Sequence, residues 1–331
     1  MYYWRLSGFY FFYFASLGAL IPYWGLYLKA QGFGVVEIGE LVAIIMATKI
    51  VAPNIWGWIA DHSGRRMRLV RLACLLTTLT FAGVFIAQGY WLLALVMSLF
   101  SFFWNAVLPQ VEVVTFYYLR DETPKYSRIR VWGSVGFVVA VTGLGYVVDS
   151  HGPSSILHVL ALLYLGIWAA TLLIPENEEE GVSGPGDSLM TIGSFLLQPG
   201  ILAFFTACLL MQMSHGSYYT FYSIYLESQG YSKSLIGELW ALGVVAEVVV
   251  YIFFMHAALV RFGAIRLLML SLLLAAVVVA GAARHGRNRR AGGIRRPARA
   301  GRRRPVRPAV RGAACPPRSR TLRAARHRCA G

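Results

Sequence analysis

The chain has 331 residues, of which 57% are hydrophobic and only 14% are charged. This balance is too apolar for a soluble globular domain and indicates a protein that crosses a membrane several times. The formal net charge of +16 is typical of a nucleic-acid-binding protein, but it is confined to one end of the chain. Residues 281–331 carry 17 arginines and no acidic residue, whereas residues 1–280 carry 14 basic and 15 acidic residues.

Nine segments are long and apolar enough to cross a bilayer as helices, which takes about 20 residues for a hydrocarbon core of about 30 Å. In chain order they are 6–28, 36–60, 69–87, 90–118, 131–150, 154–174, 199–226, 233–257 and 267–283. We expect an all-α membrane protein, because backbone polar groups in lipid must be satisfied within a helix and no alternating barrel pattern appears. The short loops after even-numbered spans hold ten basic residues and the odd loops hold two. This asymmetry predicts a multi-pass protein of the cell inner (cytoplasmic) membrane with a cytoplasmic N-terminus.

An internal repeat relates the two parts of the chain. The stretches "YLKAQGFGVVEIGEL" (27–41) and "YLESQGYSKSLIGEL" (225–239) match at eight of fifteen positions, with an offset of 198 residues. Repeated halves around a midplane cavity are typical of secondary transporters. We expect four regions: an N-terminal six-helix bundle (1–174), a cytoplasmic linker rich in Gly, Pro, Ser and Glu (175–196), an incomplete C-terminal bundle of three helices (197–283), and an Arg/Ala/Gly/Pro-rich tail without fixed structure (284–331).

The arginine-rich tail stands where the repeat predicts a helix, since the fourth span (90–118) maps onto residues 288–316. Of residues 281–331, 40 of 51 are Ala, Arg, Gly or Pro, which are the four residues encoded by codons that begin with two G or C bases. We predict a frameshift near residues 277–283 that replaces the rest of the ninth helix and three further helices, and we expect transport by this chain to be impaired. A membrane-anchored nucleic-acid-binding protein is the alternative on charge alone. Against it, the tail has no aromatic residue to stack on bases, and nine spans place it outside the cytoplasm.

The loop after the second span contains "GWIADHSGRR". Gly57 permits close helix contact, Gly64 permits a turn, and Asp61 can pair with Arg65 or Arg66. The stretch resembles the G-x-x-x-D-x-x-G-R-R/K signature of the major facilitator superfamily, in the loop where that family carries it.

Three further stretches resemble the phenylpropionate permease group, which is related to the lactose permease branch of proton symporters. They are "RIRVWGSVGF" (128–137), "HGSYYTFYSIYL" (215–226) and "SLIGELWALGVVAEVVVY" (234–251), and the resemblance covers residues 1 to about 277. It implies a two-bundle fold and proton-coupled symport, by alternating access, of a small organic solute such as an aromatic acid, sugar or nucleoside. We expect the solute, protons and the lipid bilayer as partners of a monomer. We expect no nucleic acid, cofactor, metal or enzymatic activity, since no P-loop, hydrolase or metal-ligand motif appears.

Charged residues inside spans are costly unless they face a cavity or a partner. Glu112 lies in the fourth span, and Arg130 opens the fifth, eighteen residues later. The lactose permease branch has a similar pair at its sugar site, so the resemblance implies substrate binding. A snorkelling loop arginine is the alternative for Arg130. Lys49 and Glu247 occupy equivalent repeat positions. The resemblance implies substrate binding or proton coupling for Glu247, and a structural ion pair involving Lys49 is the alternative.

The seventh span carries a polar and aromatic stripe of Gln212, His215, Tyr219 and Tyr222, whose spacing puts them on one helix face. Such a stripe suits the binding of an aromatic or small polar solute. Interhelical hydrogen bonds or an interfacial aromatic belt explain it equally well.

Overall fold

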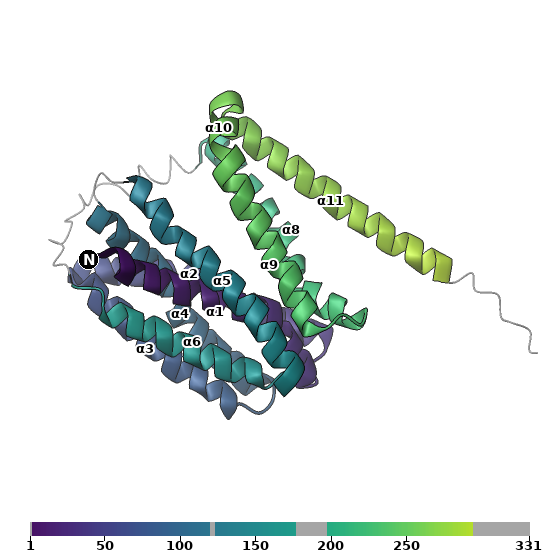
Figure 1. The fold of residues 1–331 in the computed structure, drawn as a ribbon, viewed down its shortest axis with the longest axis horizontal. Helices are drawn as coiled ribbons and strands as arrows, with labels where there is room; N and C mark the ends of the chain where they lie inside the picture. Colours follow the sequence, from purple (N-terminus) through teal and green to yellow (C-terminus); the bar gives the residue numbers. More distant parts are fainter. Residues whose placement is uncertain (1, 120–122, 177–196, 294–331) are drawn as a thin grey trace, which may run out of the picture. The chain divides into compact units, whose positions relative to one another are not determined.

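The computed structural model describes residues 2–119, 123–176 and 197–293, and within these ranges every regular element is helical (Figure 1). The helices are α1 (Tyr2–Ala30), α2 (Val35–Ser63), α3 (Arg66–Ala82), η1 (Gly83–Phe85), α4 (Tyr90–Leu119), α5 (Thr123–His151), α6 (Ser155–Leu172), α8 (Pro199–Ser228), α9 (Lys233–Val250), η2 (Tyr251–Met255), α10 (His256–Phe262) and α11 (Ala264–Gly293). The all-α prediction is therefore confirmed.

Seven helices in the described part of the chain are long and apolar enough to cross a membrane. They account for seven of the nine expected spans. The second expected span lies in α2, which is not one of the seven. The ninth lies in α11, whose apolar part is the shorter segment Ala264–Val278.

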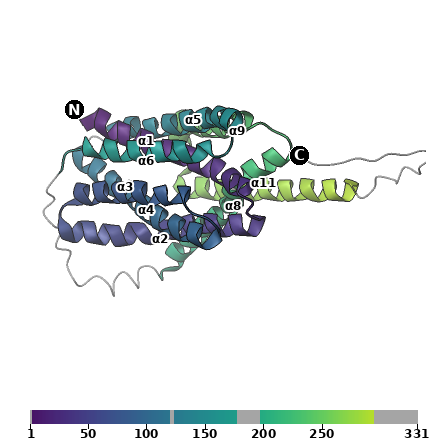
Figure 2. The ribbon, with the colours of Figure 1, turned by 90° about the horizontal axis from the view of Figure 1, so that it is seen from below.

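The first six helices form two layers. Figure 2 shows α1, α5 and α6 in one layer and α2, α3 and α4 in the other. Within the layers α1 packs on α5 and α6, and α4 packs on α2 and α3, while α3 and α6 join the layers. Small residues allow the closest of these approaches, because a Cβ atom on Gly18 of α1 would lie 2.6 Å from the backbone oxygen of Phe137. The α1–α5 contact is therefore backbone against backbone, as is common between membrane helices.

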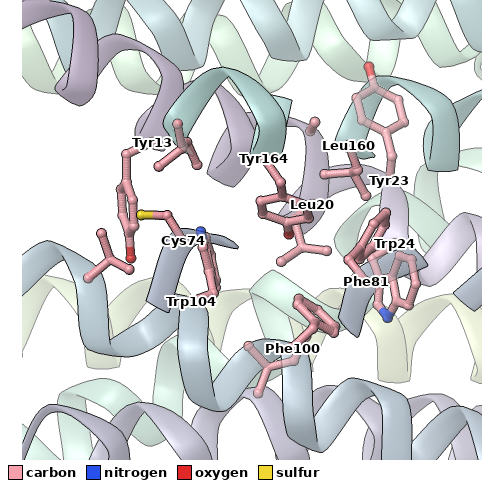
Figure 3. Close-up of a cluster of buried hydrophobic side chains, with 14 of the residues drawn as sticks. Tyr13, Leu20, Tyr23, Trp24, Cys74, Phe81, Phe100, Trp104, Leu160 and Tyr164 are labelled. Atoms are coloured by element: carbon pink, nitrogen blue, oxygen red, sulfur yellow. The ribbon is translucent and has the colours of Figure 1, made fainter. Parts of the chain in front are cut away.

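Aromatic side chains fill the space between the layers (Figure 3). Tyr13 stacks on Trp104 with ring centres 5.4 Å apart, and Phe81 packs edge-on against Tyr164 at 4.8 Å. All four are buried, as is Cys74 beside them. Aromatic rings paired in these geometries stabilise the fold by more than the burial of their surface alone. The aromatic cluster therefore holds the two layers of helices together.

The chain divides into two units, Met1–Ala280 and Gly281–Gly331. The second is described only over residues 281–293, the end of α11, which extends past residue 284 where the tail was expected to begin. The linker beyond Glu176 and the tail from residue 294 lie outside the described residues. Within the first unit, α8 packs on α1, and α9 packs on α5.

Candidate functional site

Arg130 lies inside α5 and is half-buried against α1. Its guanidinium carbon is 3.7 Å from the ring centre of Phe14 and 6.0 Å from that of Tyr10. Gly133, one turn further along α5, leaves the room for this arrangement, since a Cβ atom there would lie 2.8 Å from Arg130 Nη1 and 2.7 Å from Phe14 Cδ2. The cation is thus held over an aromatic face, which orients the guanidinium plane.

Glu112 of α4 is half-buried close to Arg130. Electrostatic interactions join its carboxylate to Arg130 and to Tyr126, and Tyr126 also interacts with Tyr10. Tyr10 in turn shares a hydrogen bond with Thr115 Oγ1 at 3.2 Å. The structure thus brings the two predicted charges together within a cluster drawn from α1, α4 and α5.

Sequence reasoning missed Tyr126 and the two α1 rings of this cluster. Tyr126 precedes Arg130 by four residues, a spacing that puts both on one face of a helix, and this signal was available. Tyr10 and Phe14 are more than a hundred residues away from Arg130 in the chain, and no local pattern marks them.

The stripe on α8 packs against Trp240 of α9. Tyr219 stacks on this ring at 6.1 Å, Tyr222 meets it edge-on at 5.6 Å, and Tyr218 lies 4.9 Å away. The Trp240 indole is buried and donates a hydrogen bond to Ser223 Oγ at 2.9 Å. The seam between the two helices is therefore aromatic, and sequence reasoning missed both Trp240 and Tyr218.

The remaining members of the predicted set are more exposed. His215 lies 5.8 Å from Tyr219 between ring centres, whereas Gln212 is exposed on α8. Glu247 is exposed on α9 and interacts electrostatically with Tyr219. Lys49 is exposed on α2, and among the described residues no ion pair joins it to Glu247. The structure therefore gathers Glu247 with the α8 stripe and leaves Lys49 apart.

The loop motif joins the C-terminal end of α2 to α4. Arg66 is buried, forms an ion pair with Asp61, and donates a hydrogen bond to Gln110 Oε1. A Cβ atom on Gly57 would lie 3.4 Å from Gln110 Nε2, so the two helices approach closely here. Gly64 ends α2 in the left-handed conformation (φ 62°), which a glycine adopts without strain.

The neighbouring arginines bind the end of α6. Arg71 Nη2 donates to the carbonyl of Ile174 at 2.7 Å, which satisfies one of the carbonyl groups just past the end of that helix. Arg68 Nε donates to Glu176 Oε2 at 2.8 Å, and Arg65 is exposed. The motif loop therefore packs on the residues from which the predicted linker begins.

Two residues related by the repeat, one at the C-terminal end of α1 and one at the C-terminal end of α8, form an ion pair. Lys29 Nζ, at the end of α1, lies 2.7 Å from Glu227 Oε2, at the end of α8, and the two positions differ by 198 residues, the repeat offset. The other carboxylate oxygen of Glu227 lies 3.0 Å from Lys233 Nζ. The Lys29–Glu227 contact therefore joins two residues that occupy equivalent positions of the sequence repeat.

The first turn of α9 is held by α5 and α1. The Asp149 carboxylate accepts hydrogen bonds from the backbone N–H groups of Lys233 (2.9 Å) and Ser234 (2.8 Å). The Tyr23 hydroxyl donates to the carbonyls of Val141 (2.7 Å) and Lys233 (3.2 Å). A carboxylate at a helix N-terminus is favoured by both the free N–H groups and the helix dipole. Hydrogen bonds that the Asp149 and Tyr23 side chains form with backbone groups therefore join α1, α5 and α9 at this junction.

Comparison with known proteins now assigns the family, since residues 3–285 match the model of the MFS_1 like family. The chain belongs to this family. Its fold is that of the major facilitator superfamily, as the sequence motifs predicted. A solved structure of the nucleoside transporter NupG superposes with a TM-score of 0.66 at 18% sequence identity, over 79% of this chain and 68% of that one.

Curated proteins similar to this chain are named as transporters. The chain is 32% identical over 249 residues to the "Probable 3-phenylpropionic acid transporter" of Escherichia coli (strain K12), covering 73% of this chain. It is 26% identical over 274 residues to the "Maltose permease" of Geobacillus stearothermophilus, covering 81% of this chain and 68% of that protein. The match spans 64% of the phenylpropionic acid transporter, slightly less than two thirds of its length.

Proposed function

We propose that this protein is a secondary transporter that moves a small organic solute across the inner membrane by alternating access, coupled to protons. Its membership of the MFS_1 like family supports this, as do relatives named as transporters of 3-phenylpropionic acid and maltose. We further propose that residues 1–174 and 197–283 belong to the two halves between which the solute passes. The observation that carries the proposal is the cluster of Glu112, Tyr126 and Arg130 inside apolar helices.

The chemistry of this cluster favours a solute with a carboxylate or paired hydroxyl groups. A guanidinium offers two parallel N–H donors that match such groups, and the Phe14 ring orients those of Arg130 before the solute arrives. The Glu112 carboxylate attracts the same guanidinium electrostatically, so the solute competes with this carboxylate for Arg130. An aromatic acid ranks first among the candidates, ahead of a sugar or a nucleoside, because its carboxylate is the stronger partner for arginine.

The α8 stripe and Glu247 supply the second part of the proposed site. The rings of Tyr219 and Tyr222, held on Trp240, offer flat apolar faces beside the His215 imidazole. Glu247 lies within electrostatic reach of Tyr219, and we assign proton coupling to this carboxylate. Gln212 and Lys49 join the proposed set because of their positions in the sequence. We assign solute contact to Gln212, and Lys49 is the charged residue at the repeat position equivalent to Glu247.

The test measures binding and uptake of a labelled panel: 3-phenylpropionate, maltose and a nucleoside. Full-length protein is reconstituted in liposomes with and without an inward proton gradient. We expect 3-phenylpropionate to bind, and Arg130→Lys to weaken its binding by about tenfold or more, because an ammonium cannot form the two-point contact. Arg261→Lys, an exposed arginine on α10, is the matched control and should bind as the wild type.

Two outcomes contradict the proposal. Wild-type protein that binds no member of the panel excludes the solute classes named here. Measurable uptake that does not respond to the proton gradient, and is equal in Glu247→Gln, excludes the assignment of proton coupling.

A further inference from the structure

The first turn of α1 lies against the second and third turns of α5 at one end of the first unit. Trp132 Nε1 of α5 donates a hydrogen bond to Tyr3 Oη of α1 at 3.0 Å, and Tyr3 Oη donates to the carbonyl of Arg128 at 3.5 Å. The indole rings of Trp4 and Trp132 lie 5.7 Å apart. Trp4 is 69% exposed, so one ring of this pair lies on the surface while the other is fixed by its hydrogen bond.

Two arginines flank the indole pair, one on each helix. Arg5 directly follows Trp4, and Arg128 precedes Trp132 by four residues, one helical turn. Both arginine side chains are exposed. No ion pair within residues 2–119, 123–176 and 197–293 joins either guanidinium to a carboxylate. This end of the α1–α5 pair therefore carries both positive charge and amphipathic rings.

An apolar track continues from this surface along both helices. On α5, Val131, Val135 and Val139 recur every four residues and are all exposed. On α1, Gly8 lies one turn after Trp4, and a Cβ atom there would meet nothing within 4 Å. The arginines and tryptophans thus lie nearer the N-terminal ends of the two helices, and the exposed apolar positions follow further along.

We propose that this surface, defined by Trp4, Arg5, Arg128 and Trp132 and named here the headgroup site, binds the anionic headgroup of a membrane phospholipid. Guanidinium groups bind phosphate oxygens through paired N–H donors, and indole rings prefer the depth of the lipid glycerol. The acyl chains then follow the valine track and the space at Gly8. The same end of the helices holds the arginine-rich even loops, which the positive-inside rule assigns to the leaflet richest in anionic lipid.

The test counts phosphatidylglycerol retained by the full chain after solubilisation from mixed phosphatidylglycerol and phosphatidylcholine bilayers, by native mass spectrometry. Each arginine near an anionic surface changes affinity by about fivefold, so Arg5→Gln combined with Arg128→Gln should lower phosphatidylglycerol affinity by at least about tenfold. The matched control replaces Arg65 and Arg261, two exposed arginines elsewhere that share the general attraction to anionic lipid, and should lower the affinity by less than the headgroup-site variant does. Because the arginine-rich tail also attracts anionic lipid, the difference between the two double variants is the measured quantity.

A second variant keeps the test valid if the charge substitutions disturb folding. Gly8→Leu fills the open space of the acyl track without touching a charge and should also lower phosphatidylglycerol retention, whereas Gly243→Leu, equally open but on α9, should not. Equal losses in the two arginine double variants overturn the proposal, as does full retention by Gly8→Leu. Displacement of the lipid by millimolar inorganic phosphate alone also overturns it, because the surface then recognises phosphate and not a phospholipid.

Discussion

Helix α9 packs closely on α1 and α5 at Gly237. A Cβ atom there would lie inside van der Waals contact with both Tyr23 Oη and the carbonyl oxygen of Val141. Neither atom moves freely, since the hydroxyl donates to that carbonyl at 2.7 Å and the carbonyl belongs to the backbone of α5. We predict that Gly237→Ala forces α5 and α9 apart and lowers the free energy of unfolding.

The magnitude follows from comparison with Gly243 on the same helix, where a Cβ atom would meet nothing within 4 Å. Alanine is more favourable than glycine inside a helix by about 0.5–1 kcal/mol, so Gly243→Ala should stabilise the protein by that amount. Gly237→Ala has the same gain but adds an overpacking cost of about 1–3 kcal/mol. The difference between the two variants isolates that cost. Gly145 and Gly143 form a second matched pair on α5, because a Cβ atom on Gly145 would lie 2.6 Å from the carbonyl oxygen of Lys233.

The assay uses the buried thiol of Cys74, which reacts with a maleimide dye when the surrounding helices separate. Cys208, Cys315 and Cys329 are replaced by serine in all samples, so that one thiol reports. The apparent midpoint of thermal unfolding should fall for Gly237→Ala relative to Gly243→Ala. Equal midpoints would show that the junction accommodates a methyl group, and the packing argument would be refuted.

Three further substitutions test individual contacts with the same thiol assay. Asp149→Asn removes the charge that caps α9 and should destabilise by about 0.5–2 kcal/mol; an unchanged midpoint would mean that water replaces the cap fully. Glu227→Gln breaks two partly exposed ion pairs, so its effect should stay below about 1 kcal/mol and disappear in 1 M salt; an effect that survives salt would contradict a screened interaction. Arg66→Lys cannot reach Asp61 and Gln110 together and should cost about 1–3 kcal/mol, and a neutral result would show that one partner suffices.

The frameshift near residues 277–283 stays a prediction, because the tail lies almost wholly outside the described residues. Reading the coding DNA in its other frames tests it directly. A frame that restores three apolar spans in line with the repeat supports the prediction, and the absence of such a frame contradicts it.

Helices could be predicted where an apolar run alone decides the structure. The span starting at residue 90 and the helix α4 agree to within a residue, because lipid requires a continuous helix of that length. Helix α2 is harder, since its charges lie within the run, and whether it crosses the membrane depends on what surrounds it. The start of α5 at Thr123 was also missed, because polar residues at a helix end carry no hydropathy signal.

The candidate site was predictable residue by residue but not as an assembly. Glu112 and Arg130 stand out because charges are rare in apolar runs. Their partners Tyr10 and Phe14 belong to a helix with aromatic residues on every side, so no pattern distinguishes the two that face the arginine. Trp240 is similar, since its role depends on how α8 and α9 pack.

By itself the sequence determined that the chain is built of membrane-length helices, that its halves are related by an offset of 198 residues, and which family it belongs to. The helices follow from the length of the apolar segments, and the repeat and the family follow from identities within short stretches of sequence. Neither requires knowledge of which residues lie close together in space. Only the tertiary structure decided that Lys29 meets its repeat-related counterpart Glu227 and that Asp149 caps α9. Such contacts depend on how helices distant in sequence pack together, and glycines such as Gly237 determine how closely those helices approach.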